Sequence, residues 1–384
     1  MDTYFSQWDF RFMNGVTTPH AGRKSFVSRL PRILFALVVV LGLVQVAPAQ
    51  AAVPNRWGYA YVNVSSGVPV LSHQAGSWSG AFNVTVTPGV PGETIVRFPQ
   101  IGGPRGVVHV TAVATTPHIC QAWKWTPVLP DEIVTVRCHQ FGGAPAFVPF
   151  TVSYSESSGA MAAPATARFG YVHYNAGIAS QYNSSGGINT VTILGIGWYK
   201  VVLPGLGSPG QAGNLQVTAQ NDTALARCKV SGWSPVPAAQ QVEVRCFNSA
   251  NVPQHSGFSL TYHKERNLVG RGLPPANFAY TFDGTPANPG PYSPLPVDVN
   301  YNSQGMLNTI RTTGLGLRLV TFPRVGFAID HVQVTAFGPG PEHCNLQSIW
   351  ATSGGTAFVR NVACYSGAAP VANQASFTTY TSTQ

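Results

Sequence analysis

The chain has 384 residues and a formal net charge of +9, but only 9% of its residues are charged, and it holds 40 Gly and 31 Pro. Lysine and arginine are scattered singly, which disfavours a dedicated nucleic-acid surface in spite of the basic balance. No window of a dozen residues carries a helical apolar period with caps, whereas short β-branched and aromatic runs recur between turns. This composition is typical of an extracellular, turn-rich, all-β protein rather than of a cytosolic enzyme.

The chain begins with features of a secretory leader. A basic segment at residues 23–32 precedes an apolar run from Ile33 to Val46 and the motif Ala49-Gln50-Ala51. The run is shorter than a membrane span, and the small residues after it are typical of a cleavage site. Residues 1–51 are therefore predicted to be a cleaved signal peptide starting at Met1 or Met13, with an uncleaved anchor as the alternative. The mature protein is expected to be secreted, without a stable membrane span.

Three copies of one pattern, about 110 residues apart, follow this leader. Each copy holds the tripeptide Val-Thr-Ala, then a cysteine, a tryptophan five or six residues later, a second cysteine, and a tyrosine 16 residues beyond that. The even number of cysteines in an exported chain predicts disulfides within the copies. The predicted pairs are Cys120–Cys138, Cys228–Cys246 and Cys344–Cys364.

Metal ligation is the alternative role for these cysteines. Histidines stand beside them in the first and third copies, but the middle copy has none there. Two cysteines per copy also fall short of a four-ligand structural zinc site. We therefore expect no metal and no other cofactor.

The middle copy gives the clearest strand pattern. Along one predicted strand Tyr199, Val201 and Leu203 alternate with polar or exposed positions and are expected to face the core, while Glu243 and Arg245 of another are expected to face water. One glycine per copy, seven residues before a proline, predicts a turn with positive φ: Gly92, Gly197 and Gly316. The predicted strands are 169–174, 190–194, 198–203, 214–220, 226–230, 241–247 and 258–263.

The predicted fold class is all-β, with three tandem small antiparallel β-sandwich modules after the signal peptide, each holding one intramodule disulfide. The predicted modules are residues 52–155, 169–263 and 278–384. The stretches 156–168 and 264–277 are predicted to be linkers, because the first is rich in Ser, Ala and Pro and the second holds scattered charges and Pro274-Pro275. This favours modules arranged like beads on a string over one closed pseudo-threefold body.

Residues suited to catalysis do not recur with the framework. Asp131 and Glu132 are the only adjacent carboxylates, and neighbours on a strand face opposite ways, which favours a solvated turn over a glycosidase dyad. No nucleophile elbow, zinc-protease helix, P-loop or dinucleotide fingerprint is present. We expect no catalytic residue and no enzyme.

The tryptophans are the strongest candidates for ligand contact, because an exposed indole stacks on sugar rings. Trp125, Trp233 and Trp350 occupy the same framework position beside a cysteine, which favours a place in the core. The predicted ligand-binding aromatics are the tryptophans that the copies do not share, Trp78, Trp123 and Trp198. Weaker candidates are Tyr61, Tyr174, Tyr182 and Tyr301.

Four short sequence motifs of the middle copy are also informative. It reads Gly-x-Gly-x-Tyr-x-Val at 195–201, Pro-Gly-Leu-Gly at 204–207, Arg-Cys-Lys-Val-x-x-Trp at 227–233 and Val-x-Val-Arg-Cys-Phe at 242–247. This resembles a family of uncharacterised secreted repeat proteins from actinobacteria and other soil bacteria, over most of residues 57–381. The resemblance implies a bacterial, exported β-repeat protein and maps no catalytic or binding residue.

Two hypotheses for function remain. The first is a secreted, non-enzymatic protein whose repeated modules raise avidity for cell-wall or extracellular polysaccharide or another cell-surface component. The alternative is a secreted hydrolase or protease inhibitor that uses variable loops of one copy. An enzyme predicts buried, paired acids in one copy only, and an inhibitor predicts a rigid exposed loop, such as residues 121–137. The ligand and the oligomeric state stay open.

Overall fold

The computed structural model describes residues 55–156, 165–270 and 277–383. The predicted signal peptide and parts of both predicted linkers, residues 157–164 and 271–276, lie outside these ranges. The described residues form antiparallel β-sheets with two short 3-10 turns, η1 (Leu71–His73) and η2 (Val297–Val299), and no α-helix. Within these ranges no helix has the length and hydropathy needed to cross a membrane.

The strands follow the three sequence copies. The first copy holds β1 (Arg56–Val62), β2 (Gln74–Gly76), β3 (Thr85–Pro88), β4 (Glu93–Phe98), β5 (Val107–Ala112), β6 (His118–Val128), β7 (Asp131–Gln140) and β8 (Phe150–Glu156). The second holds β9 (Arg168–Tyr174), β10 (Ile178–Asn183), β11 (Thr190–Gly195), β12 (Trp198–Pro204), β13 (Asn214–Gln220), β14 (Ala226–Val236), β15 (Ala239–Asn248) and β16 (Gly257–Lys264). The third holds β17 (Asn277–Asp283), β18 (Asn300–Asn302), β19 (Thr309–Gly314), β20 (Leu317–Phe322), β21 (Asp330–Ala336), β22 (His343–Leu346), β23 (Ala351–Ser353), β24 (Thr356–Ser366), β25 (Ala369–Pro370) and β26 (Ser376–Ser382).

Each copy contributes an inner and an outer layer with the same strand order. The inner layers are β2-β1-β8-β5, β10-β9-β16-β13 and β18-β17-β26-β21. The outer layers are β3-β4-β7-β6, β11-β12-β15-β14 and β19-β20-β24-β22, with β23 and β25 added to β24. The inner layer of the second copy continues into the outer layer of the first, because β13 and β6 are joined by a parallel bridge between Gln220 and Ala122.

Most local predictions for the middle copy are confirmed. The seven predicted strands correspond to β9 and β11–β16, and only β10 was not predicted. Tyr199, Val201 and Leu203 are buried, and Glu243 and Arg245 on β15 are only partly buried. The three predicted disulfides are present, and the three turn glycines have φ of 77°, 61° and 68°.

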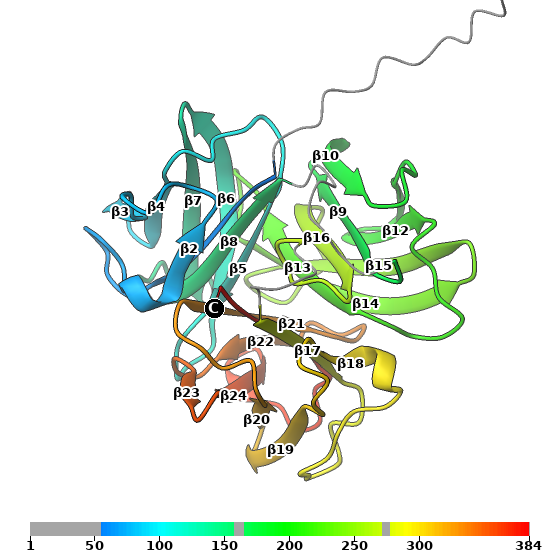
Figure 1. Cartoon of the computed structure of the whole chain (residues 1–384). Coiled ribbons are helices and arrows are strands. Elements are labelled where there is room, and N and C mark those ends of the chain that lie inside the picture. The colour runs from blue at the N-terminus through cyan, green and yellow to red at the C-terminus, as the bar shows by residue number, and fades with distance from the viewer. Residues whose placement is uncertain (1–54, 157–164, 271–276, 384) are drawn as a thin grey trace, which may run out of the picture. The chain divides into compact units, whose positions relative to one another are not determined.

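The expectation of beads on a string is wrong, because the described residues of all three copies belong to one compact unit. Three parallel bridges connect the copies in a cycle: the end of β13 to β6, the residue after β21 to β14, and the residue after β5 to β22. Figure 1 shows β5, β13 and β21 where the copies meet. The stretch after β16 also packs, since Leu268 and Val269 are buried and Val269 shares a cluster with Trp57 and Tyr59. The contacts between copies therefore close on themselves.

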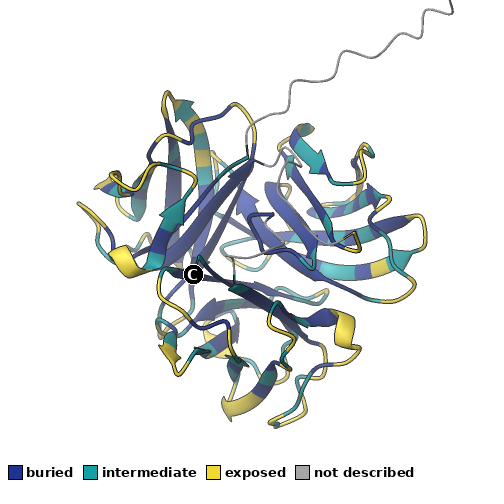
Figure 2. Cartoon of the chain, viewed as in Figure 1, coloured by how far each residue is buried: buried dark blue, intermediate teal, exposed yellow. Residues whose placement is uncertain are grey.

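The Val-Thr-Ala tripeptides make the innermost of these contacts. Each valine N–H donates to the threonine hydroxyl of another copy, at 3.0 to 3.1 Å: Val110 to Thr218, Val217 to Thr335, and Val334 to Thr111. The strands that carry them are buried on both faces, as their continuous dark blue colour in Figure 2 shows. Because a buried backbone N–H needs an acceptor, this ring of hydrogen bonds fixes the copies together. We call it the threonine ring.

The framework tryptophans pack across the same junctions. Trp233 and Trp350 are buried, as expected, whereas Trp125 is only partly buried and packs against the core of the first copy. Each ring also contacts aromatic side chains of the next copy in the cycle. The ring pairs are Trp125 with His173 (4.2 Å between centroids), Trp233 with Phe282 and Phe377 (5.5 and 5.2 Å), and Trp350 with Tyr61 and His73 (5.8 and 5.2 Å).

Candidate functional site

One of the predicted aromatics, Trp78, lines a surface groove of about 400 Å³ between the first and third copies. Strands β1 and β2 and the loop after β2 form most of it, and Ile329 and Thr383 of the third copy complete it. The groove thus depends on the closure of the cycle. Its lining residues are Trp57, Leu71, Gln74, Ala75, Gly76, Trp78, Gly80, Phe82, Asn83, Ile329 and Thr383.

Two glycines allow the indole of Trp78 to lie against the sheet. A Cβ on Gly76 would stand 1.8 Å from the ring, and one on Gly58 would stand 2.6 Å from it. The ring also packs on Phe98, with 6.2 Å between centroids, and its Nε1 donates to the carbonyl oxygen of Phe82 at 2.9 Å. These contacts fix the orientation of the ring, which remains partly exposed.

The groove is apolar and uncharged. Leu71 is 59% exposed and Phe82 is 47% exposed, and none of the described lining residues carries a charge. The side-chain amide of Gln74 is hydrogen-bonded to the backbone: Nε2 donates to Pro69 O, and Oε1 accepts from the Val84 N–H. The surface suits a neutral ligand with an apolar face, such as the C–H face of a sugar ring. Sequence reasoning missed Leu71 and Phe82; Phe82, in the stretch Ser79-Gly80-Ala81-Phe82-Asn83, could have been suspected as an aromatic residue among small and polar ones.

A clamp between the copies lies beside this groove. His73 Nδ1 is 2.5 Å from Asp330 Oδ1, and Tyr380 donates its hydroxyl to the other carboxylate oxygen at 2.8 Å. The Tyr59 hydroxyl donates to the carbonyl oxygen of Ile329 at 2.8 Å. Two copies are thereby held together where they shape the groove.

The other two predicted aromatics lie elsewhere, on the outer layers. The guanidinium carbon of Arg137 stands 3.4 Å from the ring centroid of Trp123, and that of Arg245 stands 4.4 Å from the ring of Trp198. Both rings are partly exposed, and neither lines the Trp78 groove. The structure does not bring the three predicted tryptophans together. Among the weaker candidates, Tyr61 and Tyr174 are buried, whereas Tyr182 and Tyr301 are partly exposed.

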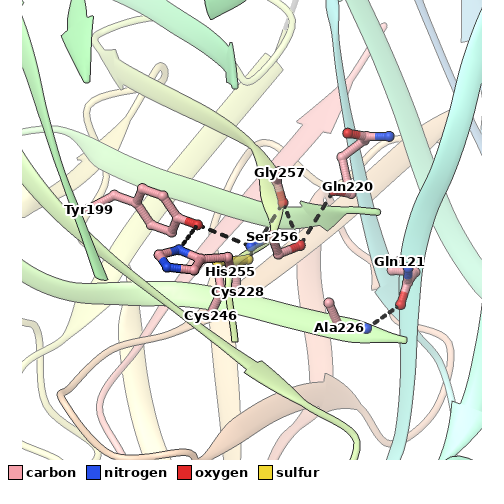
Figure 3. Close-up of a disulfide and its surroundings, with 9 residues drawn as sticks. All are labelled: Gln121, Tyr199, Gln220, Ala226, Cys228, Cys246, His255, Ser256 and Gly257. Carbon is pink, nitrogen blue, oxygen red and sulfur yellow. Dashed lines mark hydrogen bonds between the residues drawn. A yellow bond between two sulfur atoms is a disulfide. The ribbon is translucent and has the colours of Figure 1, made fainter. Parts of the chain in front are cut away.

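A second surface cleft, of about 510 Å³, belongs to the second copy alone. Buried Tyr174 and Tyr199 contribute to its lining, together with exposed Asn175, Asp222 and His255. Figure 3 shows Tyr199, His255 and Ser256 close to the Cys228–Cys246 disulfide. The same view shows a junction contact, in which the Ala226 N–H donates to Gln121 of the first copy at 2.6 Å.

The polar groups of this cleft are largely engaged with one another. The Tyr199 hydroxyl accepts from the Ser256 N–H at 3.0 Å and lies 3.2 Å from His255 Nδ1. The Ser256 hydroxyl donates to the carbonyl oxygen of Gly257 at 2.9 Å rather than to the imidazole beside it. Ser256 and His255 are therefore not arranged as a nucleophile and its base. Burial raises the pKa of Tyr199, which keeps its hydroxyl neutral.

The acidic pair Asp131 and Glu132 does not form the solvated turn that was expected. Both residues are buried, and hydrogen bonds offset part of the cost: Arg97 Nε donates to Asp131 at 2.6 Å and the Gly103 N–H donates to Glu132 at 3.0 Å. Burial raises the pKa of Glu132 to about 8, and the charge of nearby Glu156 adds to this rise. Neither Glu132 nor Glu156 lines the two clefts described above.

The described residues contain no group of three or more His, Cys, Asp or Glu side chains placed to hold a metal ion. Comparison of the chain with protein-family models, with curated proteins and with solved structures finds no match.

Proposed function

We propose that the protein is an exported, non-enzymatic β-repeat protein that binds a neutral extracellular or cell-wall polysaccharide in the Trp78 groove. One observation carries the proposal: an oriented, partly exposed indole lies with exposed Phe82 and Leu71 in an uncharged groove of about 400 Å³. Sugar rings place their C–H faces on such aromatic surfaces, because the faces are apolar although the ring edges are not. The three disulfides suit an oxidising compartment, to which the proposed signal peptide at residues 1–51 would direct the chain.

Polar groups at the rim would give the groove its specificity. Asn83 and Thr383 stand among the apolar lining residues and offer an amide and a hydroxyl to sugar hydroxyls. A polyanion would find no cation in the groove. We therefore propose a neutral glycan rather than an acidic one, and a single binding groove at one junction rather than one in each copy.

Retention of the mature chain, residues 52–384, on insoluble neutral glycans and on peptidoglycan tests this function. Phe82→Ala removes an exposed aromatic side chain without touching the core, and Trp78→Ala removes the indole itself. Both variants are expected to lose retention, while the matched variant Trp198→Ala on an outer layer is expected to keep it. Circular dichroism establishes that each variant is folded. Equal retention of folded Phe82→Ala and the parent chain, or no retention of the parent on any glycan, would overturn the proposal.

A secreted hydrolase is the second candidate, and the buried carboxyls Glu132 and Glu156 favour it. The second copy has Gln240 and Lys264 at the corresponding positions, and the third has Ser382 at the position of Glu156, so this pair belongs to the first copy alone. A carboxyl group that stays protonated near neutral pH can serve as a general acid. A panel of glycoside hydrolase assays on the parent chain and on Glu132→Gln tests this second candidate function. Turnover abolished by the substitution would support it, and a silent panel would remove it.

A further inference from the structure

A small cavity of about 60 Å³ lies beside the threonine ring, where all three copies meet. The three Val-Thr-Ala tripeptides form one part of its lining, and the first cysteine of each copy and the residues beside it form the rest. This volume admits a few water molecules or one small ion and excludes an organic ligand. The cavity is separate from both surface clefts. Its charged and titratable lining residues are His118, Arg227, Lys229, Glu342 and His343.

Positive charge exceeds negative charge around this cavity. Arg227 and Lys229 of β14 are both buried, and the only carboxylate of the lining is that of Glu342, 3.2 Å from Lys229 Nζ. Arg227 is held by oxygen atoms that carry no full charge, since its guanidinium donates to Pro341 O and Asn248 O at 2.8 Å each and also to Asn251. A buried cation without a counter-charge is costly. One positive charge is left to be neutralised.

A buried imidazole adds an unused donor. His343 is 7% exposed, and within the described residues neither of its ring nitrogens has a hydrogen-bond partner. Burial, together with the charge of Arg227, lowers the pKa of His343 to about 3, so the ring is neutral and carries one N–H. Burial likewise lowers the pKa of Lys229 to about 8, although Glu342 opposes this effect. Such cationic and N–H donors are the groups that hold anions in proteins.

We propose that this cavity binds one small inorganic anion, held by Lys229, Arg227 and His343 at the junction of the second and third copies. The ion supplies the missing negative charge and accepts a hydrogen bond from His343, whose ring nitrogens have no protein partner among the described residues. It binds where the copies meet, so it stabilises the closed arrangement of the whole unit.

Thermal unfolding of the mature chain in sodium chloride, nitrate, sulfate and phosphate, at constant ionic strength against gluconate, tests the proposal. At least one of these anions is expected to raise Tm saturably with concentration. In Lys229→Met the apparent affinity should fall roughly tenfold or more, whereas Lys124→Met, which removes an exposed lysine of the first copy, should respond like the parent. Equal anion responses in all three proteins would overturn the proposal.

A second measurement covers the case in which Lys229→Met does not fold. Crystals of the parent chain soaked in bromide should show anomalous density in the cavity beside Lys229 and His343. His343→Phe keeps an aromatic ring and removes the N–H, and it should weaken the anion response without unfolding the chain. Absence of bromide from the cavity, with an unchanged anion response in His343→Phe, would contradict the assignment.

Discussion

The junctions between the copies and the surface clefts are built from different kinds of sequence position. The threonine ring and the framework tryptophans use residues that recur in all three copies. The Trp78 groove and the cleft of the second copy use residues that the copies do not share, such as Phe82 and His255. Residues that recur in all three copies therefore form contacts between the copies, whereas residues that differ between the copies line the surface clefts.

The largest expected difference in stability between these two regions comes from replacing a buried tryptophan at a junction and a partly exposed one on an outer layer. Trp233→Ala removes a buried ring that joins two copies and should cost about 3–5 kcal/mol in the free energy of unfolding. Trp198→Ala removes a partly exposed ring beside Arg245 and should cost about 1 kcal/mol. Urea unfolding of both variants measures the difference. Similar losses would mean that the recurrent position has no special part in assembly.

The second largest loss of stability is expected on substitution of a threonine in the threonine ring. Thr335→Val keeps the shape of the side chain but removes the acceptor of the Val217 N–H and the donor to Gln216, at 3.0 and 2.9 Å. Leaving such buried groups without partners costs about 1–3 kcal/mol. Thr87→Val on β3, where the threonine is exposed, is the matched control and should change stability little. If the two substitutions are equally mild in urea unfolding, the ring does not hold the copies together.

The pH dependence of the free energy of unfolding should distinguish the first copy from the second. The pKa of Glu132 is about 8 in the folded chain, above its ordinary value of 4.5, so the folded state holds a proton that the unfolded state has released. Its contribution to stability is complete below pH 4.5 and is lost as pH rises towards 8, by up to about 1.4 kcal/mol per pH unit. Glu132→Gln stays neutral and should gain stability relative to the parent over this window.

Urea unfolding of Glu132→Gln and the parent between pH 5 and 8 measures that difference. Taking the difference between the two proteins cancels the effect of the buried histidines, which are present in both. Asp222→Asn, at an exposed carboxylate, is the control. The second copy carries the buried amide Gln240 at the position of Glu132, so Gln240→Glu should introduce a slope of the same sign. A flat difference for Glu132→Gln would show that its carboxyl is not held neutral.

The smallest effect is expected at the hairpin tips. Ile196 is 67% exposed and Leu315, at the corresponding tip of the third copy, is 64% exposed. Ile196→Ser should change the free energy of unfolding by less than about 0.5 kcal/mol, because the side chain gains little burial on folding. Chemical denaturation measures this. A loss above 1 kcal/mol would mean that the tip packs against something in solution, such as a second chain.

Local structure could be predicted from the sequence because period-two alternation, cysteine spacing and turn glycines act over short stretches. The strands of the middle copy and the disulfides were predicted on these grounds, but β10 was missed because its sequence, Ile178-Ala-Ser-Gln-Tyr-Asn183, mixes apolar and polar residues without alternating. The relative placement of the copies could not be read in this way. Alternation predicts that the polar face of a strand meets water, yet the polar faces of β5, β13 and β21 are buried.

The candidate site was predicted only in part, for a related reason. Trp78 was singled out because no other copy shares it, but the groove also needs Ile329 and Thr383, which lie far away in sequence. Glu132 was expected in a solvated turn because neighbouring residues on a strand face opposite ways, whereas burial of its carboxyl is costly. The structure offsets that cost with the Gly103 N–H and a raised pKa, and neither leaves a signal in the sequence.

The cycle of contacts also bears on the order of the copies along the chain. Thr383 of the third copy lines the same groove as Trp57 of the first, so the two ends of the described chain lie close together. Each copy stands in the same relation to its neighbours, because the bridges and the threonine ring treat all three alike. A circular permutant, joined between β26 and β1 and opened between β8 and β9, should therefore fold to the same structure. In this fold no copy is structurally the first or the last.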